Sequence, residues 1–362
     1  MYRSDVVGSL LRPSSLKEAR AKHEVGELSD REFKQLEDKA IEDAIELQHR
    51  AGVDVITDGE MRRYAFYGHL IDALEGFDKF GGWAIPFRDE KGEELVLKRP
   101  VVVSKLRRKR HMCAEEFTWL RTKTNKQAKT TLISAQQAAA YYDKEKSKGA
   151  YSTVDAYLAD LVDILRGEID ELIRLGCTYI QIDSPQYTAL LDPNLREGFR
   201  KRGSDPDRLL DLSIEMDNAI IQNDARPQDI TFALHLCRGN NQSKFYAQGD
   251  YGPITQVFQK TTFDRFLLEF DDARSGGFEP LSSVPEDREV VLGLVSSKKA
   301  ELESKAELKK RIEEASQFIS RERLAISPQC GFASTMEGNL LTEKDQEAKL
   351  RLVAEIAHEM WG

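Results

Sequence analysis

The most constraining feature of the sequence is a regular alternation between short apolar runs and longer segments with helical spacing. Continuous apolar runs are typical of parallel strands that are covered on both faces. The eight candidate strands are Ser4–Ser9, Val53–Asp58, Lys129–Ser134, Tyr179–Asp183, Ile230–Cys237, Arg265–Phe270, Glu289–Ser296 and Arg323–Pro328. Eight such repeats in a chain of 362 residues favour an α/β fold of the (β/α)8 barrel (TIM barrel) type over an open sheet.

The segments between these strands have the spacing of amphipathic helices. Ser29–Gly52 and Thr153–Gly176 are rich in charged residues, and each ends at a glycine that can cap a helix just before the next strand. No GxGxxG motif follows a strand, which removes the main support for a dinucleotide-binding fold. No linker divides the chain, so we expect residues 1–362 to form one catalytic barrel domain.

Two stretches depart from the plain repeat. Gly76–Arg110 is predicted to be a loop and small hairpin inserted after the second strand, and Leu190–Asp207 a long loop after the fourth. Long loops on a barrel usually build or cover the active-site face. We therefore expect both stretches to shape a binding pocket.

The charge balance excludes some classes of partner. The chain has a net charge of −9, with 40% hydrophobic and 32% charged residues, which disfavours nucleic acid as the main partner. The basic run Lys105–His111 could contact an anionic substrate, or it could simply be the solvated start of a surface helix. No apolar run is long enough for a membrane span or signal peptide, so we expect a cytoplasmic protein that needs no membrane. The four cysteines are too sparse for a disulfide scaffold and should be thiols or metal ligands.

One constellation of residues suggests metal chemistry. His235 and Cys237 are two residues apart on a strand, so they point to the same side at its carboxyl end. Glu269 lies inside an apolar strand, and Cys330 follows the last strand. One imidazole, two thiolates and one carboxylate would form a four-ligand zinc site, whereas Mg²⁺ and Ca²⁺ do not favour thiolates. Taken singly, each residue also has a structural explanation: a core histidine, buried thiols, or a Glu269 that pairs with a core arginine such as Arg274.

Six motifs, spread along nearly the whole chain, include these residues and resemble the motifs of a known enzyme family. The chain resembles the catalytic C-terminal barrel of cobalamin-independent methionine synthase, and most closely the short single-barrel proteins similar to that enzyme. The motifs are VGSLLRP (7–13), DVITDGEMRR (54–63), YIQIDSP (179–185), HLCRGN (235–240), LLEFDDARSG (267–276) and SPQCGFAS (327–334). They occur in the family's order, at the expected strand ends.

The resemblance implies a zinc enzyme that transfers a methyl group from a methylated folate to homocysteine. Its zinc ligands fall on His235, Cys237, Glu269 and Cys330. Among these, Glu269 is expected to act in catalysis, because the hardest donor should yield when a substrate thiol arrives. The groups that bind the amino acid substrate fall on Ser9, Glu60 and Asp183. Acidic side chains suit an ammonium group, although Ser9 could instead cap a segment, Glu60 pair with Arg62 or Arg63, and Asp183 begin a turn.

Two departures from the family pattern leave the alkyl donor open. Ser296–Lys298 stands where the larger enzyme has an acidic histidine, and residues 183–185 read Asp-Ser-Pro instead of Asp-Glu-Pro. A methylated folate, a methylated corrinoid or an epoxide-type electrophile therefore all remain candidates, as do a C–S lyase and a non-catalytic zinc- or thiol-binding protein. The sequence is equally compatible with a monomer and a homodimer.

Overall fold

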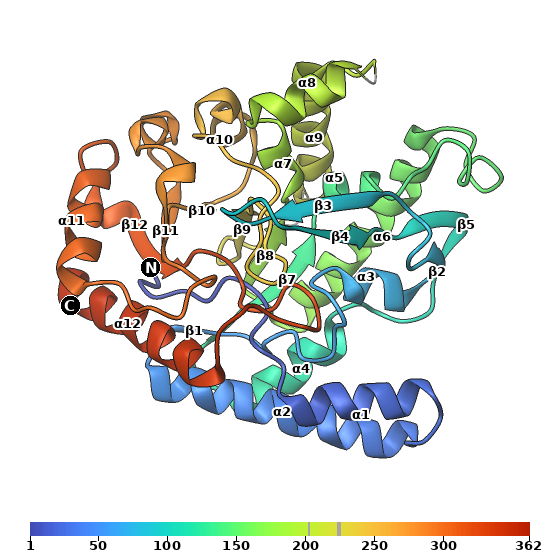
Figure 1. Cartoon of the computed structure of the whole chain (residues 1–362), viewed down its shortest axis with the longest axis horizontal. Helices are drawn as coiled ribbons and strands as arrows, with labels where there is room; N and C mark the ends of the chain where they lie inside the picture. Colours follow the sequence, from blue (N-terminus) through green and yellow to red (C-terminus); the bar gives the residue numbers. More distant parts are fainter. Residues whose placement is uncertain (202, 223–225) are drawn as a thin grey trace.

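A computed structural model describes residues 1–201, 203–222 and 226–362. Six parallel strands form its main sheet, in the order β12-β11-β10-β9-β8-β7 (Figure 1). The strands are β1 (Val55–Ile56), β2 (Leu74–Asp78), β3 (Ala84–Arg88), β4 (Glu94–Lys98), β5 (Val101–Arg108), β6 (Gln127–Ala128), β7 (Thr130–Ile133), β8 (Tyr179–Asp183), β9 (Thr231–Leu236), β10 (Arg265–Glu269), β11 (Glu289–Val295) and β12 (Leu324–Pro328). The α-helices are α1 (Ser14–Glu24), α2 (Asp30–Ala51), α3 (Gly68–Ala73), α4 (Ala114–Lys123), α5 (Ala135–Ala139), α6 (Val154–Arg174), α7 (Gln186–Ala189), α8 (Pro193–Lys201), α9 (Pro206–Ile221), α10 (Gln256–Lys260), α11 (Lys305–Ala315) and α12 (Glu343–Trp361).

The sheet closes into a (β/α)8 barrel, as predicted. β1 pairs with β6, which runs directly into β7, and Lys129 N donates to Ile56 O at 3.0 Å. The N-terminal segment closes the other side, since Ser4 forms a parallel bridge with Ile326 of β12. Asp54 N donates to Ser4 O at 3.2 Å and joins this segment to the residue before β1. The first candidate strand is thus in its expected place, although it forms only an isolated bridge.

The barrel interior is filled in layers. One small apolar cluster draws a residue from the N-terminal segment and from six of the strands: Val7, Val55, Tyr179, Ala233, Leu267, Val291 and Ala325. At its amino-terminal end lies a buried polar group in which Asp5 contacts Lys129 at 2.6 Å and Tyr179 OH at 2.5 Å. Side chains two residues further along the strands reach the carboxyl end. The interior is therefore a packed core, open to ligands only at its carboxyl end.

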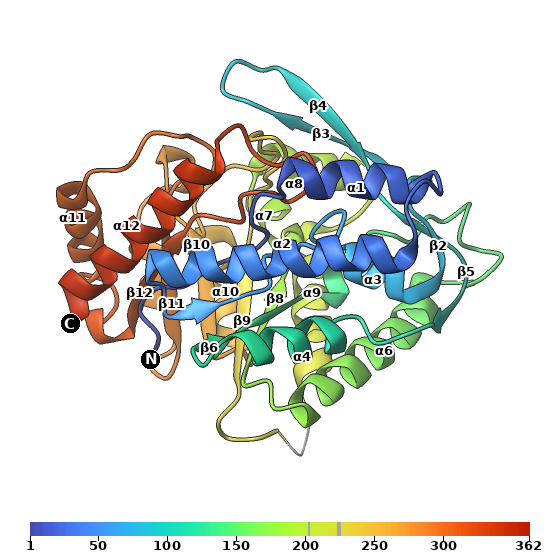
Figure 2. The same cartoon turned by 90° about the horizontal axis from the view of Figure 1, so that it is seen from below.

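The outer helices begin and end where the sequence predicts. Ser29 caps α2 in a reciprocal capping box with Glu32, and Gly52 ends the helix in the left-handed region at φ 91°. Thr153 caps α6 by accepting from Ala156 N. The helices surround the strands, as Figures 1 and 2 show. In the described part of the chain, no helix is long and apolar enough to cross a membrane.

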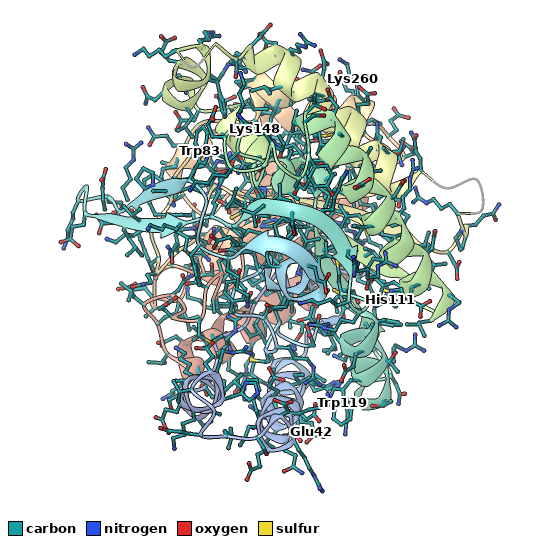
Figure 3. All side chains as sticks on the ribbon, turned by 90° about the vertical axis from the view of Figure 1, so that its right-hand side faces the viewer. Glu42, Trp83, His111, Trp119, Lys148 and Lys260 are labelled. Carbon is teal, nitrogen blue, oxygen red and sulfur yellow. The ribbon has the colours of Figure 1, made fainter. Side chains whose placement is uncertain are left out.

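The insertion after the second strand is confirmed as an antiparallel structure. β2 pairs with β5, and β3 pairs with β4 in a hairpin that projects from the barrel in Figure 2. The first four residues of the basic run Lys105–His111 form the end of β5, and the run does not start a helix. Its side chains do not line the cavity described below, and in Figure 3 His111 lies on the side of the molecule opposite the hairpin.

The prediction of a long loop at Leu190–Asp207 is wrong. Half of this stretch forms α8, and its end starts α9, which Asp205 caps by accepting from Asp207 N. The segment contains proline, aspartate and asparagine, which usually mark loops. Here Pro193 and Pro206 stand at first helical positions, where a missing N–H costs nothing.

Candidate metal centre and active site

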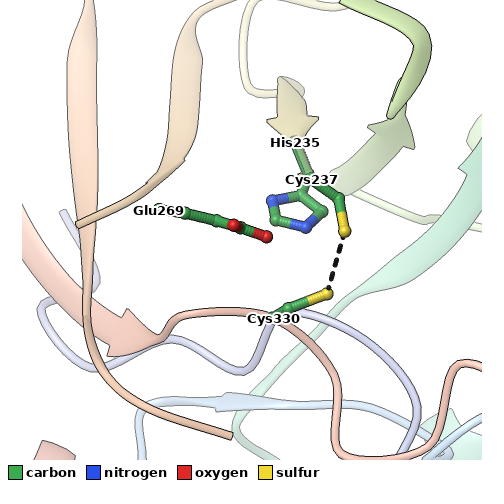
Figure 4. A group of neighbouring side chains, drawn as sticks. All are labelled: His235, Cys237, Glu269 and Cys330. Atoms are coloured by element: carbon green, nitrogen blue, oxygen red, sulfur yellow. Dashed lines mark hydrogen bonds between the residues drawn. The ribbon is translucent and has the colours of Figure 1, made fainter. Parts of the chain in front are cut away.

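Four side chains converge at the carboxyl ends of three strands. His235 lies on β9 and Cys237 just after it, Glu269 ends β10, and Cys330 follows β12. One donor atom from each residue lies within 4.8 Å of the others, and all four residues are buried. Figure 4 shows the four side chains pointing toward one another, with the two sulfurs 3.4 Å apart. The parallel register explains the convergence, because Leu267 of β10 lies opposite His235.

The histidine is oriented toward this group. His235 Nδ1 lies 3.2 Å from Leu267 O, while the buried Nε2 makes no hydrogen bond within the described residues. A backbone carbonyl on one ring nitrogen fixes the tautomer and leaves the other as a free lone pair, which is the usual arrangement of a metal-binding histidine. An unpaired buried nitrogen is otherwise costly. The four donors therefore fit a metal ion.

The pKa values of three side chains in the cluster also fit a metal site. The hydrogen bond from Cys237 and the nearby His235 lower the pKa of Cys330 to about 5. Burial alone would lower the pKa of His235, but the Cys330 sulfur and the charges of Asp183 and Glu269 raise it to about 9. The hydrogen bond shared with Cys330 raises the pKa of Cys237. Without a metal ion the imidazole and the two sulfurs therefore share protons, and a bound cation would replace those protons.

Glu269 is held by a network of its own. Its Oε1 accepts from Arg238 N at 3.1 Å and from Gln329 Nε2 at 3.0 Å. Tyr251 OH accepts from the Glu269 backbone N at 2.9 Å, and Arg238 Nη1 donates to that hydroxyl at 2.8 Å. Arg274, the alternative partner that the sequence suggests, pairs with Asp272. Among the described residues Glu269 therefore forms no ion pair, and backbone and amide groups orient it.

The N-terminal segment brings Ser9 against the last strand. Phe332 N donates to Ser9 O at 2.7 Å, and a Cβ added to Gly331 would meet Ser9 N at 2.7 Å. Only glycine allows this close approach. Ser9 is buried, and its hydroxyl donates to Glu60.

Glu60 occupies a strained backbone position in the same place. It follows Gly59, and both residues have positive φ, 68° and 56°. A non-glycine residue in the left-handed region is uncommon and is often found at functional sites. The Glu60 carboxylate accepts from Thr131 Oγ1 at 2.6 Å and lies 3.4 Å from Arg63 Nη1. The ion pair with Arg63 that the sequence suggests is therefore present. Glu60 also lines the cavity described below.

Asp183 differs from Glu60 in its charged neighbours. Its Oδ1 accepts from Gln181 Nε2 at 2.8 Å, and within the described residues it forms no ion pair with lysine or arginine. Burial raises the pKa of Asp183 to about 7. A positively charged ligand would favour its ionised form.

One cavity of about 70 Å³ joins these groups. His235, Cys237 and Cys330 line it together with Ser9, Glu60 and Asp183. Sequence reasoning missed the opposite wall. It consists of Ile85, Phe87, Leu97 and Arg99 from the insertion, Tyr67, Gln137, Tyr141 and Tyr246. The placement of the insertion over the site was expected, but its individual residues carry no recognisable motif.

The stretch that replaces the family histidine lies behind the cluster. Ser297 Oγ donates to Gln329 Oε1 at 2.9 Å, and Gln329 in turn donates to Glu269. Ser296 Oγ donates to Asp271 Oδ2 at 2.8 Å. None of the residues 296–298 lines the cavity. This stretch therefore supports Glu269 and supplies no acid that faces the cavity.

Comparisons with known proteins agree with this geometry. The family model of the cobalamin-independent synthase catalytic domain matches residues 3–358. This chain belongs to that family. Membership supports an activity of the methionine synthase class, methyl transfer to homocysteine.

Individual relatives of this cobalamin-independent synthase domain cover nearly its full length. The Bacillus subtilis protein YxjH is 36% identical over 364 residues, 99% of this chain and 95% of its own. The methionine synthase of Pyrococcus abyssi is 26% identical over 328 residues, 91% of this chain and 85% of its own. A Listeria monocytogenes structure assigned to the vitamin-B12-independent methionine synthases has a TM-score of 0.76 and 27% identity, covering 100% of this chain and 98% of that one.

Proposed function

We propose that this chain is a zinc-dependent S-methyltransferase that methylates the thiol of homocysteine. The observation that carries the proposal is the cluster of His235, Cys237, Glu269 and Cys330, three of whose members line a cavity together with Ser9, Glu60 and Asp183. Two thiolates with an imidazole and a carboxylate match the preferences of Zn²⁺. When bound, zinc supplies the Lewis acidity that keeps a substrate thiol deprotonated at neutral pH.

The chain's own residues would position the amino acid. Asp183, a buried carboxylate that forms no ion pair with lysine or arginine in the described part of the chain, would bind the α-ammonium group. Glu60 would support it from the opposite side, and the Ser9 hydroxyl, now donated to Glu60, would turn to the substrate carboxylate. Glu269 would be the ligand that yields, because Arg238 N and Gln329 Nε2 already satisfy one of its oxygens.

The surrounding wall would exclude water from the nucleophile. Phe87, Ile85 and Leu97 cover the cavity from the insertion. Excluding water strengthens the electrostatic interactions in the site and protects a reactive thiolate. The methyl donor is a methylated folate or another methylated compound that enters the same cavity.

Metal content tests the ligand assignment. The wild-type protein should retain one zinc ion per chain after dialysis, while C237S and C330S should each retain less than about a tenth of that. Zinc is measured by atomic emission and folding by circular dichroism. The matched control is C177S, because Cys177 is buried but bonds to Tyr179 O outside the cluster. Full zinc content in both cluster variants would contradict the assignment.

A further inference from the structure

Arg99 places a positive charge in the cavity that the residues assigned to zinc and to the amino acid also line. It lies between β4 and β5, and its backbone is fixed on both sides: Arg99 N donates to Trp83 O, and Arg99 O accepts from Gly82 N, both at 2.9 Å. The side chain lines the same cavity as Cys237, Cys330 and Asp183.

This guanidinium has no acidic partner. Within the described residues Arg99 forms no ion pair, whereas Arg63 pairs with Glu116 at 2.8 Å. With the Gln186 amide turned so that its oxygen faces Arg99, Nη1 and Nη2 donate to that neutral oxygen at 2.9 and 2.5 Å. A guanidinium has five donors, so most of its capacity is unused. Arg99 is only half-buried, so its free donors are open to water and to an anion that enters the cavity.

The groups around Arg99 are aromatic. The positive charge of Arg99 opposes the burial-driven rise in the pKa of Tyr67, Tyr141 and Tyr246, which places all three hydroxyls near it. Tyr246 also connects this region to the metal cluster through Thr188. The Thr188 hydroxyl lies 3.4 Å from Tyr246 OH and donates to the Cys237 carbonyl oxygen at 2.7 Å. A ligand here would thus have an apolar or aromatic part beside the thiol and an anionic group on Arg99.

We propose that Arg99 binds an anionic group of the methyl donor, so that the second substrate is an organic anion with a carboxylate, sulfonate or phosphate beside an apolar body. The inference rests on the proposed function, in which the amino acid occupies Ser9, Glu60 and Asp183 and leaves Arg99 to the other substrate. A planar guanidinium suits all three oxyanions because it can bind two oxygens at once. Arg99 thereby selects donors by charge.

Calorimetric titration of the zinc-loaded protein with benzoate and with its neutral analogue benzamide tests this. Wild-type protein should bind benzoate at least about tenfold more tightly than benzamide. R99Q should lose this preference and R99K should retain part of it. The control is R107Q, because Arg107 lies in the same insertion but its side chain is 81% exposed. A benzoate preference that survives in R99Q, or its absence from the wild-type protein, would overturn the proposal.

A second titration separates the two substrates. Homocysteine should bind R99Q within about twofold of its affinity for the wild-type protein. A loss of about tenfold or more would assign Arg99 to the amino acid and overturn the proposal. If homocysteine fails to bind the zinc-loaded wild-type protein, the proposed function fails, while the benzoate preference still reports on Arg99 independently. Retained zinc in R99Q and R99K shows that both variants are folded around an intact site.

Discussion

Asp217 is a buried carboxyl whose ionisation should be visible in the stability of the protein. It lies on α9, where Gln136 N and Ser184 Oγ donate to it over long distances, both 3.4 Å. Burial raises its pKa from 3.8 to about 7. The folded protein therefore binds an extra proton between these values, so this carboxyl lowers the stability as the pH rises from about 4 to about 7.

The variant D217N should remove that dependence. Relative to the wild-type protein, D217N should gain stability between pH 5 and pH 8, by at most about 3 kcal/mol, because about two pH units of the titration window lie between these conditions. Chemical denaturation at both pH values measures the difference. D229N, at an exposed position, is the control. An identical pH dependence in D217N and the wild-type protein would contradict a raised pKa in the folded state.

Single residues differ in how far their roles could be predicted from the sequence. His235 and Cys237 were predictable because strand geometry puts residues i and i+2 on one side. Ser9, Glu60 and Asp183 came from motifs, and the structure places all three on the cavity wall, although their substrate-binding role stays a prediction. Arg99 was not predictable, because its position depends on the pairing of an insertion with no recognisable pattern.

Among the elements, the β3–β4 hairpin matters most for the site. Arg88 and Phe245 exchange backbone hydrogen bonds of 2.8 and 2.9 Å, and Lys244 contacts Asp89 at 2.6 Å, so the hairpin is anchored to the loop after β9. Phe87 packs against Tyr246 with ring centroids 5.8 Å apart. The hairpin thus covers the cavity without belonging to the barrel core.

The variant F87A should open this cover without unfolding the barrel. In metal-free protein, iodoacetamide should alkylate Cys237 and Cys330 several-fold faster than in the wild type, because less of the cavity is shielded from solvent. Mass spectrometry of the modified peptides measures the rates. V96A is the control, because Val96 lies on the same hairpin but is 56% exposed. Equal rates in F87A and the wild-type protein would show that the hairpin does not shield the site.

Elements that repeat a pattern were predictable, and elements that depend on distant partners were not. The parallel strands follow from continuous apolar runs, and the long outer helices follow from helical spacing of apolar residues and from capping residues at their ends. The N-terminal segment was placed correctly but forms only a bridge at Ser4, because closing a barrel depends on the register of the whole sheet. The helix α8 was missed, because its turn-forming residues disguise helical spacing over a short length.

At the scale of the whole molecule, the barrel depends on a buried charge group at its amino-terminal end. Lys129 Nζ contacts Asp5 Oδ1 at 2.6 Å and donates to Gln181 Oε1 at 2.7 Å, with no exposure of either charged side chain. Arg265 approaches Asp5 Oδ2 at 3.4 Å from β10. The group connects the N-terminal segment to strands far along the chain.

Removing one partner should destabilise the whole fold. K129M should lower the free energy of unfolding by about 3–5 kcal/mol, because Asp5 would lose its nearest buried counter-charge. The double variant D5N/K129M should lose less than the sum of the two single variants, since neither charge is then left alone. Urea denaturation of the four proteins measures the coupling. Additive losses would mean that the pair contributes no interaction of its own.

In the proposed function, a zinc ion held by His235, Cys237, Glu269 and Cys330 receives the substrate thiol. Zinc X-ray absorption of the loaded protein, with and without homocysteine, tests it most directly. Zinc should have two sulfur neighbours before homocysteine is added and three afterwards, at distances near 2.3 Å. A zinc shell with other than two sulfurs, or one that homocysteine leaves unchanged, would contradict the claim.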